Sequence, residues 1–434
     1  MAALPPASED PATSPGTGSP DPSELDSSAF AALSNKSYRT LFVSATIVVF
    51  GVMGQAVARG WLALELSGSN AGLGGVMLAF GGAMLVTTPI GGVTADRCDK
   101  RTILFVSVSF LMVTALLLGV AAVTETVEYW MLVVASAVQA AAFAFYLPAR
   151  IAFISEVVGP DLLRNAVVLA QISQETARVL APALAGLLVG VAWFGVGGVF
   201  LGSGVAIAIA ALMLTRLPKV APPAARTTSP FGDLVDAASF VRGNPDVLIV
   251  GLLTIGVVMI GFPYLTFLPS LADDRFDDGA TGYGIMSGVA GLGAFCAGMI
   301  DAFRNRGMRP RRLVVASGLT LGAMLVALGL SPNYVTALIS LFVIGGSALV
   351  FQTSTQILML RMSPVEYQGR LQSVVILGFS GFGLAALPLG LLADAISLGA
   401  TLVCMGIVII VLNIWFALVR LRHVRTRSPD FDQL

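Results

Sequence analysis

Two oppositely charged side chains, Glu175 and Arg178, lie within a long apolar stretch of this 434-residue chain. Three residues apart on a helix, they share one face. Ionisable groups inside an apolar span are costly and therefore mark candidate functional sites. Desolvation favours the protonated acid, whereas the arginine favours the carboxylate, so a proton or a substrate can shift that balance. The alternative is a permanent ion pair that holds this helix to its neighbours.

The stretch around this pair is one of twelve that can cross a bilayer, which takes about 20 mainly apolar residues. Only 12% of the residues are charged and 56% are hydrophobic, whereas soluble proteins carry about 25% charged residues. The sequence thus predicts an all-α membrane protein with twelve transmembrane helices. Their expected ranges are 38–64, 71–94, 102–123, 128–154, 163–190, 193–214, 246–271, 281–302, 313–330, 333–360, 370–395 and 398–420.

The charges between the spans predict the orientation. Nearly all basic residues fall on one side, whereas the other side receives Arg275 among several acids, including Glu125 and Asp277. Cytoplasmic loops carry the excess of lysine and arginine, so both termini are expected in the cytoplasm and the protein in the cell (plasma) membrane as a multi-pass protein. Glu175 lies about 16 Å along its helix from Arg164, near the middle of the bilayer.

Composition further divides the chain into five parts. Residues 1–37 form a Pro- and Ser-rich tail of disordered composition. Two halves of six spans follow, 38–214 and 246–420. Between them, 215–245 is a proline-rich linker that ends in a segment with the spacing of an interfacial helix. Residues 421–434 form a second cytoplasmic tail.

A dense cluster of charges, Gly92-Val-Thr-Ala-Asp96-Arg97-Cys98-Asp99-Lys100-Arg101, separates the second and third spans. It closely resembles the signature loop of the major facilitator superfamily, Gly-x-x-x-Asp-Arg-x-x-Arg-Lys/Arg. Three further segments resemble its drug/proton antiporter branch, which includes macrolide-efflux and enterobactin-export proteins. They are 61–69, 146–150 and 368–370. The resemblance implies two pseudo-symmetric six-helix halves and transport by alternating access.

The resemblance also implies a cytoplasmic gate. In it, Asp96 reaches the start of the eleventh helix, where the helix dipole favours an anion. The alternative is that the basic residues of the loop only anchor the topology. The predicted gate residues are Gly92, Asp96, Arg97, Lys100, Arg101, Arg150, Glu156 and Arg370.

In this superfamily the first, fourth, seventh and tenth helices line a central cavity. Here they carry aromatic rings and amides, which suit an amphipathic small-molecule substrate. The alternative for each residue is ordinary helix packing, and for Arg59 it is a side chain that extends to the membrane interface. The predicted cavity residues are Gln55, Arg59, Gln139, Phe143, Tyr146, Tyr264, Gln352 and Gln356.

Other function classes fit the sequence poorly. No lysine follows a glycine, so the chain has no P-loop for ATP. No span holds a catalytic or metal-binding constellation, and the zero net charge argues against nucleic acid. We therefore expect no enzyme, no cofactor and no metal site. The leading hypothesis is a monomeric, proton-coupled exporter of an amphipathic compound (a drug, macrolide or siderophore-like molecule) in the lipid bilayer. Uptake, lipid or siderophore transport, and a receptor-like role without transport remain as alternatives.

Overall fold

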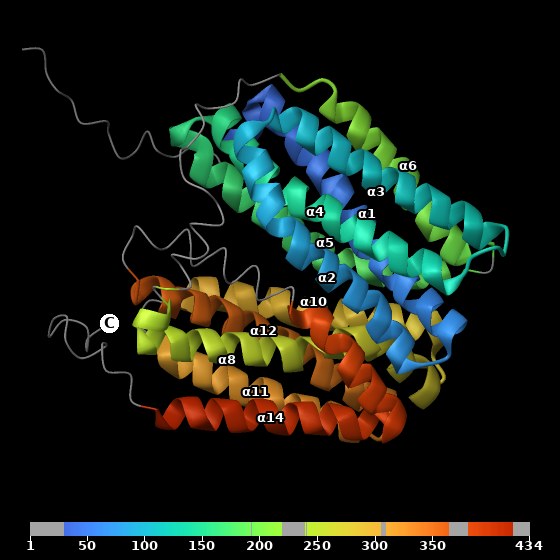
Figure 1. Cartoon of the computed structure of the whole chain (residues 1–434), viewed down its shortest axis with the longest axis vertical. Helices are drawn as coiled ribbons and strands as arrows, with labels where there is room; N and C mark the ends of the chain where they lie inside the picture. Colours follow the sequence, from blue (N-terminus) through green and yellow to red (C-terminus); the bar gives the residue numbers. More distant parts are fainter. Residues whose placement is uncertain are drawn as a thin grey trace, which may run out of the picture.

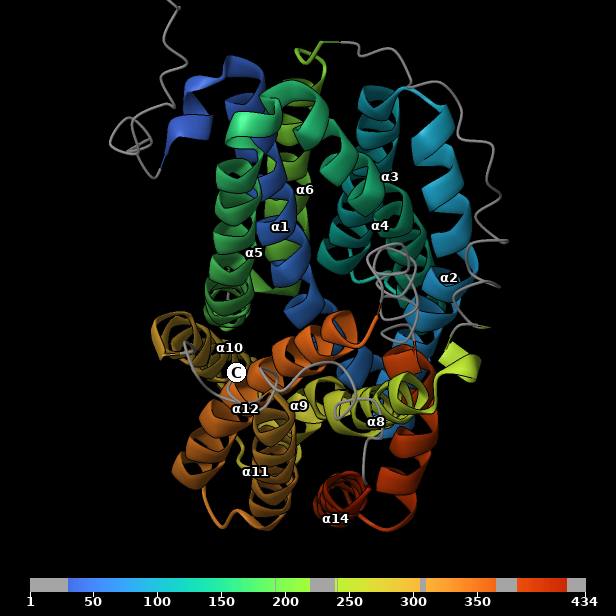
Figure 2. The same cartoon turned by 90° about the vertical axis from the view of Figure 1, so that its left-hand side faces the viewer.

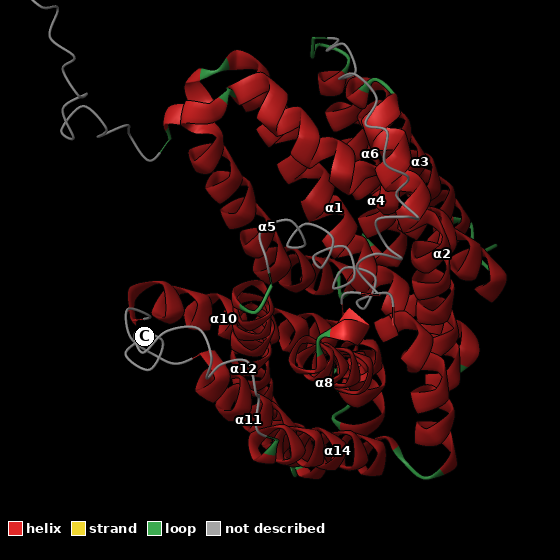
Figure 3. Ribbon diagram, turned by 60° about the vertical axis from the view of Figure 1, so that its left-hand side comes forward, coloured by secondary structure: helices red, strands yellow, loops and turns green. Residues whose placement is uncertain are grey.

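The architecture was analysed in a computed structural model that describes residues 30–191, 193–218, 239, 241–304, 310–363 and 381–419. These ranges consist of helices joined by short turns, and they contain no strand (Figure 3). A helix satisfies its backbone hydrogen bonds internally, as a segment in lipid requires. This explains why so apolar a chain is helical. The first half comprises α1 (Lys36–Ser67), α2 (Asn70–Arg97), α3 (Lys100–Val123), α4 (Tyr129–Val158), α5 (Pro160–Val189) and α6 (Gly195–Leu214).

The second half repeats this number of spans. Its first span is irregular: α8 (Pro245–Gly261) continues through a 3₁₀ turn (Phe262–Phe267), α9 (Leu268–Ser270) and a π-helical turn (Leu271–Arg275). The remaining helices are α10 (Gly279–Arg304), α11 (Pro310–Leu330), α12 (Tyr334–Arg361), the helix Gly381–Ala395 and α14 (Leu398–Leu418).

Ten of the described helical segments are long and apolar enough to cross a membrane. The other two predicted spans are also helices. One is α5, whose 30 residues extend about 45 Å but include the polar residues Gln171, Gln174, Glu175 and Arg178. The other is the apolar helix Gly381–Ala395. Its first residue is also the first residue of the described range 381–419. The predicted all-α class with twelve spans is thereby confirmed, while the interfacial helix predicted within 215–245 falls largely outside the described residues.

The helices alternate in direction between two faces of the bundle. We call one the basic face, defined by Lys36, Lys100, Arg101, Arg216 and Arg311, and the other the acidic face, defined by Glu65, Glu125, Glu128, Asp278 and Asp394. At the acidic face, Gly68 ends α1 in the left-handed conformation with φ 60°. The Ser69 side chain then accepts from Gly72 N at 3.1 Å and starts α2. This short turn places the first residues of α2 at the acidic face.

The two halves touch near the acidic face. There α5 packs against α10, and α2 extends beside the helix Gly381–Ala395 (Figure 2). A methyl group added to Gly186 would lie 2.2 Å from Gly284 Cα, and one added to Gly390 would lie 2.4 Å from Asn70 O, so both helix pairs are in backbone contact. From this contact the ribbons of the two halves diverge toward the basic face (Figure 1).

Candidate functional site

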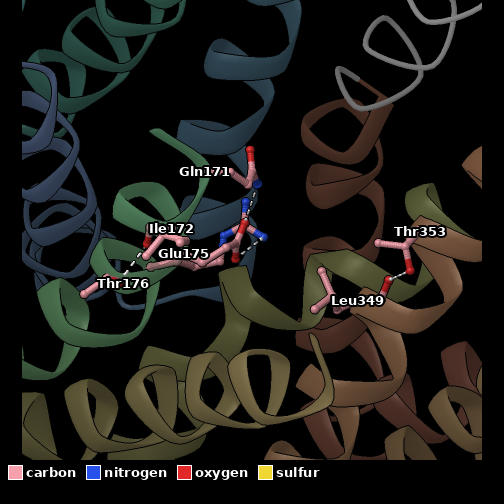
Figure 4. Close-up of polar contacts among 7 residues, drawn as sticks. Gln171, Ile172, Glu175, Thr176, Leu349 and Thr353 are labelled. Carbon is pink, nitrogen blue, oxygen red and sulfur yellow. Dashed lines mark hydrogen bonds and ion pairs between the residues drawn. The ribbon is translucent and has the colours of Figure 1, made fainter. Parts of the chain in front are cut away.

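The charged pair of α5 forms within that single helix. Glu175 Oε1 accepts a hydrogen bond from Gln171 Nε2 at 3.0 Å, and Glu175 Oε2 lies 3.6 Å from Arg178 Nη1 (Figure 4). The side chain of Glu175 is 20% exposed and that of Arg178 is 45% exposed. Both partners of Glu175 belong to α5, so among the described residues its carboxylate forms no hydrogen bond or ion pair to another helix. This weakens the interpretation of the pair as a clamp between helices.

Glu175 lies on the face of α5 that packs against α10. Farther toward the acidic face, this side of α5 meets three glycines of α10, in the order Val179 with Gly291, Ala183 with Gly288, and Gly186 with Gly284. Glu175 is one turn before Val179, just beyond the last of these contacts. Figure 4 shows Gln171 and Glu175 turned toward α12 of the other half, across from Thr353. The carboxylate therefore lies at the boundary where the two halves part.

The predicted gate residues are only partly brought together. Lys100 Nζ lies 2.5 Å from Glu156 Oε1, which joins α3 to α4. Arg101 Nη2 donates to Thr215 O after α6, and the Arg97 side chain is exposed. All these contacts stay within the first half. The side chain of Asp96 and the whole of Arg370 lie outside the described residues, so a latch between them stays a prediction.

Gly92, the first residue of the signature loop, and its neighbour Gly91 differ sharply in their surroundings. A methyl group added to Gly91 would lie 2.2 Å from Ala144 O, so α2 and α4 are in backbone contact there. One added to Gly92 would meet no atom within 4 Å. Gly92, a predicted gate residue, is therefore not required by the packing of this conformation.

Arg150 was predicted at the gate but lies deeper in the first half. It is 8% exposed, its Nη2 donates to Gln174 Oε1 of α5 at 3.2 Å, and its guanidinium lies 5.9 Å from the Tyr146 ring. From the end of α4 at Val158 it is eight residues, or about 12 Å, away. With Tyr38 it lines a small pocket between α1, α4 and α5. Arg150 thus links α4 to α5 in this conformation.

Arg59 is buried at 4% exposure, and its Nη1 donates to Gln139 Oε1 of α4. Gln55 lies one turn earlier on α1 and is 3% exposed. Arg59 Nε and Gln55 Nε2 make no hydrogen bond in the part of the chain that the structure describes. A side chain that extended to the membrane interface would be exposed, so the alternative interpretation of Arg59 does not fit this arrangement.

The other predicted cavity residues divide by exposure. Tyr146 and Tyr264 are both buried, at 1% and 4% exposure. Phe143 is half-buried and its ring meets that of Tyr146 edge-on, with centroids 6.0 Å apart. Gln352 and Gln356 are half-buried one turn apart on α12. A role in substrate binding stays a prediction for all of them.

Comparison with known proteins identifies the family. The sequence profile of the transmembrane secretion effectors matches residues 27–431, nearly the whole chain. The chain belongs to this family. It is therefore a membrane transporter of the major facilitator type, as the signature loop predicted, and not an enzyme.

Two relatives align with most of this transporter. It is 25% identical over 409 residues to the uncharacterized MFS-type transporter YfiS of Bacillus subtilis, which covers 87% of this chain and 93% of that protein. It is 25% identical over 403 residues to the enterobactin exporter EntS of Shigella flexneri, covering 91% and 94%. Both alignments run through both halves.

Solved structures confirm the fold of the transporter. The nucleoside transporter NupG has a TM-score of 0.69 at 15% identity and covers 87% of this chain and 98% of its own. A bacterial homologue of the human lysosomal transporter Spinster, solved in an inward-facing and occupied conformation, has a TM-score of 0.71 at 14% identity and covers 91% and 99%.

One contact between the halves of the transporter was missed by the sequence analysis. Asp394, in the helix Gly381–Ala395, accepts hydrogen bonds from the backbone of Asn70 and Ala71 at the start of α2. The one available signal was an acid near the end of an apolar stretch. Nothing in the sequence indicated its partner, which lies 324 residues away.

Proposed function

We propose that this transporter exports an amphipathic small molecule in exchange for protons, with Glu175 as the proton-coupling residue and Arg178 as the group that responds to its charge. The supporting observation is the position of the Glu175 carboxylate. It lies midway along α5 and at the boundary where the halves part, so opening and closing would change its solvation. A group that couples proton binding to conformation requires such a change.

The environment of the pair supports this role. The 3.6 Å distance and partial exposure leave the Glu175 carboxylate weakly held, so a proton can reach it in this conformation. Protonation would release Arg178, whose backbone carbonyl lies 3.0 Å from a methyl position at Gly291 of α10. The proposed change of charge would thus occur one helical turn from the contact between the halves.

The proposal includes an orientation of the transporter in the membrane. We place the basic face in the cytoplasm, together with both termini, because positively charged loops remain on that side. The present conformation, closed at the acidic face, is then inward-facing. In the outward-facing conformation, Asp96 at the end of α2 would close against the eleventh helix, which the sequence predicts to begin at Arg370. The transporter acts as a monomer in this scheme.

The substrate class rests on two observations. Amides and hydroxyls lie on both sides of the boundary between the halves, with Gln171 on α5 across from Thr353 on α12 and Gln352 half-buried beside Thr353 in the chain. Such groups suit a molecule with both apolar and hydrogen-bonding parts. The relative named as an enterobactin exporter supports outward transport of a siderophore-like compound.

The test is transport by purified protein in proteoliposomes with an imposed proton gradient. A panel of lipophilic dyes, macrolides and catechol siderophores would be supplied to wild type, Glu175→Gln and Glu128→Gln. Glu128 is the matched control, since its carboxylate accepts from Trp130 Nε1 at 2.6 Å at the acidic face, away from α5.

Gradient-driven flux in wild type and Glu128→Gln that is absent in Glu175→Gln would support the proposal. Equal gradient-driven flux in all three proteins would remove Glu175 from the coupling mechanism. Flux unaffected by the gradient in wild type would overturn proton coupling itself.

A further inference from the structure

Asp394 caps the first turn of α2 from the opposite half of the protein. Its Oδ1 accepts from Asn70 N and Asn70 Nδ2, both at 2.9 Å, and its Oδ2 accepts from Ala71 N at 2.8 Å. The first N–H groups of a helix have no partner within the helix. Ser69 caps only Gly72 N, so Asp394 satisfies donors that the local cap leaves free. An anion at this end of α2 is also favoured by the helix dipole.

These three hydrogen bonds depend on direct contact between helix backbones. Added methyl groups at Gly74, Gly383 and Gly390 would lie 2.5 Å from Ala386 O, 2.4 Å from Met77 O and 2.4 Å from Asn70 O, respectively. Hydrogen bonds weaken steeply beyond about 3.5 Å. A separation of the two helices by a few ångströms would therefore break all three bonds together.

We propose that Asp394 is a gating residue that holds the acidic face closed through the start of α2 and releases it on each transport cycle. The inference rests on alternating access by this fold, and is independent of the substrate, the coupling ion and the role of Glu175. The latch predicted for Asp96 at the basic face would give the antiparallel pair of α2 and the helix Gly381–Ala395 a carboxylate at each end. The closed state at one face is then stabilised by a contact that the other state lacks.

The proposal is tested by the distance between the halves at the acidic face. Spin labels are attached to cysteines introduced at Leu66 and Leu330, which lie in the last turns of α1 and α11 and are 38% and 65% exposed. The native cysteines Cys98, Cys296 and Cys404 are replaced by serine. Pulsed electron–electron double resonance then gives the distribution of distances between the two labels in the absence of substrate.

Two variants weaken the latch from its two sides. Asp394→Asn removes the charge and replaces one of the two acceptor oxygens by an amide nitrogen, which cannot accept, with little change of shape. Asn70→Pro removes two of the three donors and leaves Asp394 intact. Proline is favoured at the first helical position, and Ser69 already has the extended conformation that a following proline requires, with φ −150° and ψ 150°. Glu128→Gln is the control, an acid of the same face that is bonded within its own half.

We expect both variants to raise the population at longer distances, by about tenfold for Asp394→Asn, because hydrogen bonds to a charged group are the stronger ones. Glu128→Gln should leave the distribution unchanged. Unchanged distances in both latch variants, with thermal unfolding like that of the parent, would overturn the proposal. If Asp394→Asn fails to fold, Asn70→Pro decides alone.

Discussion

Lys100 at the start of α3 and Glu156 at the end of α4 form an ion pair with Nζ 2.5 Å from Oε1. The Lys100 side chain is only 4% exposed. Because both residues belong to the first half, the pair would persist in the proposed movement of one half against the other. This ion pair therefore stabilises the first half. A gate, in contrast, requires a charged residue that changes its partner between conformations.

Replacement of Lys100 by alanine should destabilise the protein without a specific effect on its conformational equilibrium. The substitution leaves Glu156 without its partner. Breaking a fully buried pair costs about 3–5 kcal/mol of unfolding free energy. We expect a smaller loss here, because the Glu156 side chain is 21% exposed. Thermal unfolding in detergent measures this loss. Lys100→Met combined with Glu156→Leu should recover most of it, and a single variant as stable as wild type would contradict the assignment.

A larger side chain at Gly186 should prevent closure of the acidic face. Gly186→Val places atoms where the backbone of Gly284 lies, 2.2 Å from the first added carbon. Overpacking of this kind costs about 1–3 kcal/mol, so transport should fall by about tenfold. Gly82→Val is the matched control, because an added carbon at Gly82 meets nothing within 4 Å. Equal transport by the two variants would show that the α5–α10 contact is not needed.

The sequence was sufficient for the spans and for the residues that bear charge within them. The length of an apolar stretch predicts a membrane helix almost independently of the neighbouring helices. The twelve spans could therefore be predicted, with the ends of the described helices accurate to a few residues. For example, α1 begins at Lys36, where residue 38 was expected. Glu175 and Arg178 could be paired because their spacing along one helix fixes their distance.

Contacts between helices could not be predicted in the same way. Lys100 and Glu156 were both assigned to the gate, but their pairing depends on how α3 and α4 end side by side. The hydrogen bonds between Asp394 and Asn70 join residues 324 positions apart. No local pattern encodes such a contact, because it arises only when the two halves pack. The burial of Arg59 was missed for the same reason.

Removal of the Gln139 side-chain amide should destabilise the first half through Arg59. Gln139→Leu leaves the buried guanidinium without its acceptor, which costs about 1–3 kcal/mol or more for a charged group. Arg59→Met in the same chain removes the stranded charge, so the double variant should be more stable than Gln139→Leu alone. Thermal unfolding of the three variants measures the coupling, and additive losses would indicate that Arg59 and Gln139 act independently.

Gly91 and Gly92 are adjacent, yet they should respond differently to the same substitution. Gly91→Leu would force α2 away from Ala144 of α4, so the protein should unfold at a lower temperature or fail to fold. Gly92→Leu meets open space in this conformation, and thermal stability should be retained. Gly92 lies one turn before Asp96, on the side predicted to meet the eleventh helix when the basic face closes.

A leucine at Gly92 would therefore obstruct only the other conformation. We expect Gly92→Leu to lower transport by about tenfold or more, in line with the cost of overpacking, while the spin-label distance between positions 66 and 330 stays at its short value. Normal transport by this variant would exclude close approach of another helix at Gly92. Loss of stability equal to that of Gly91→Leu would instead place Gly92 among the packing residues of the first half.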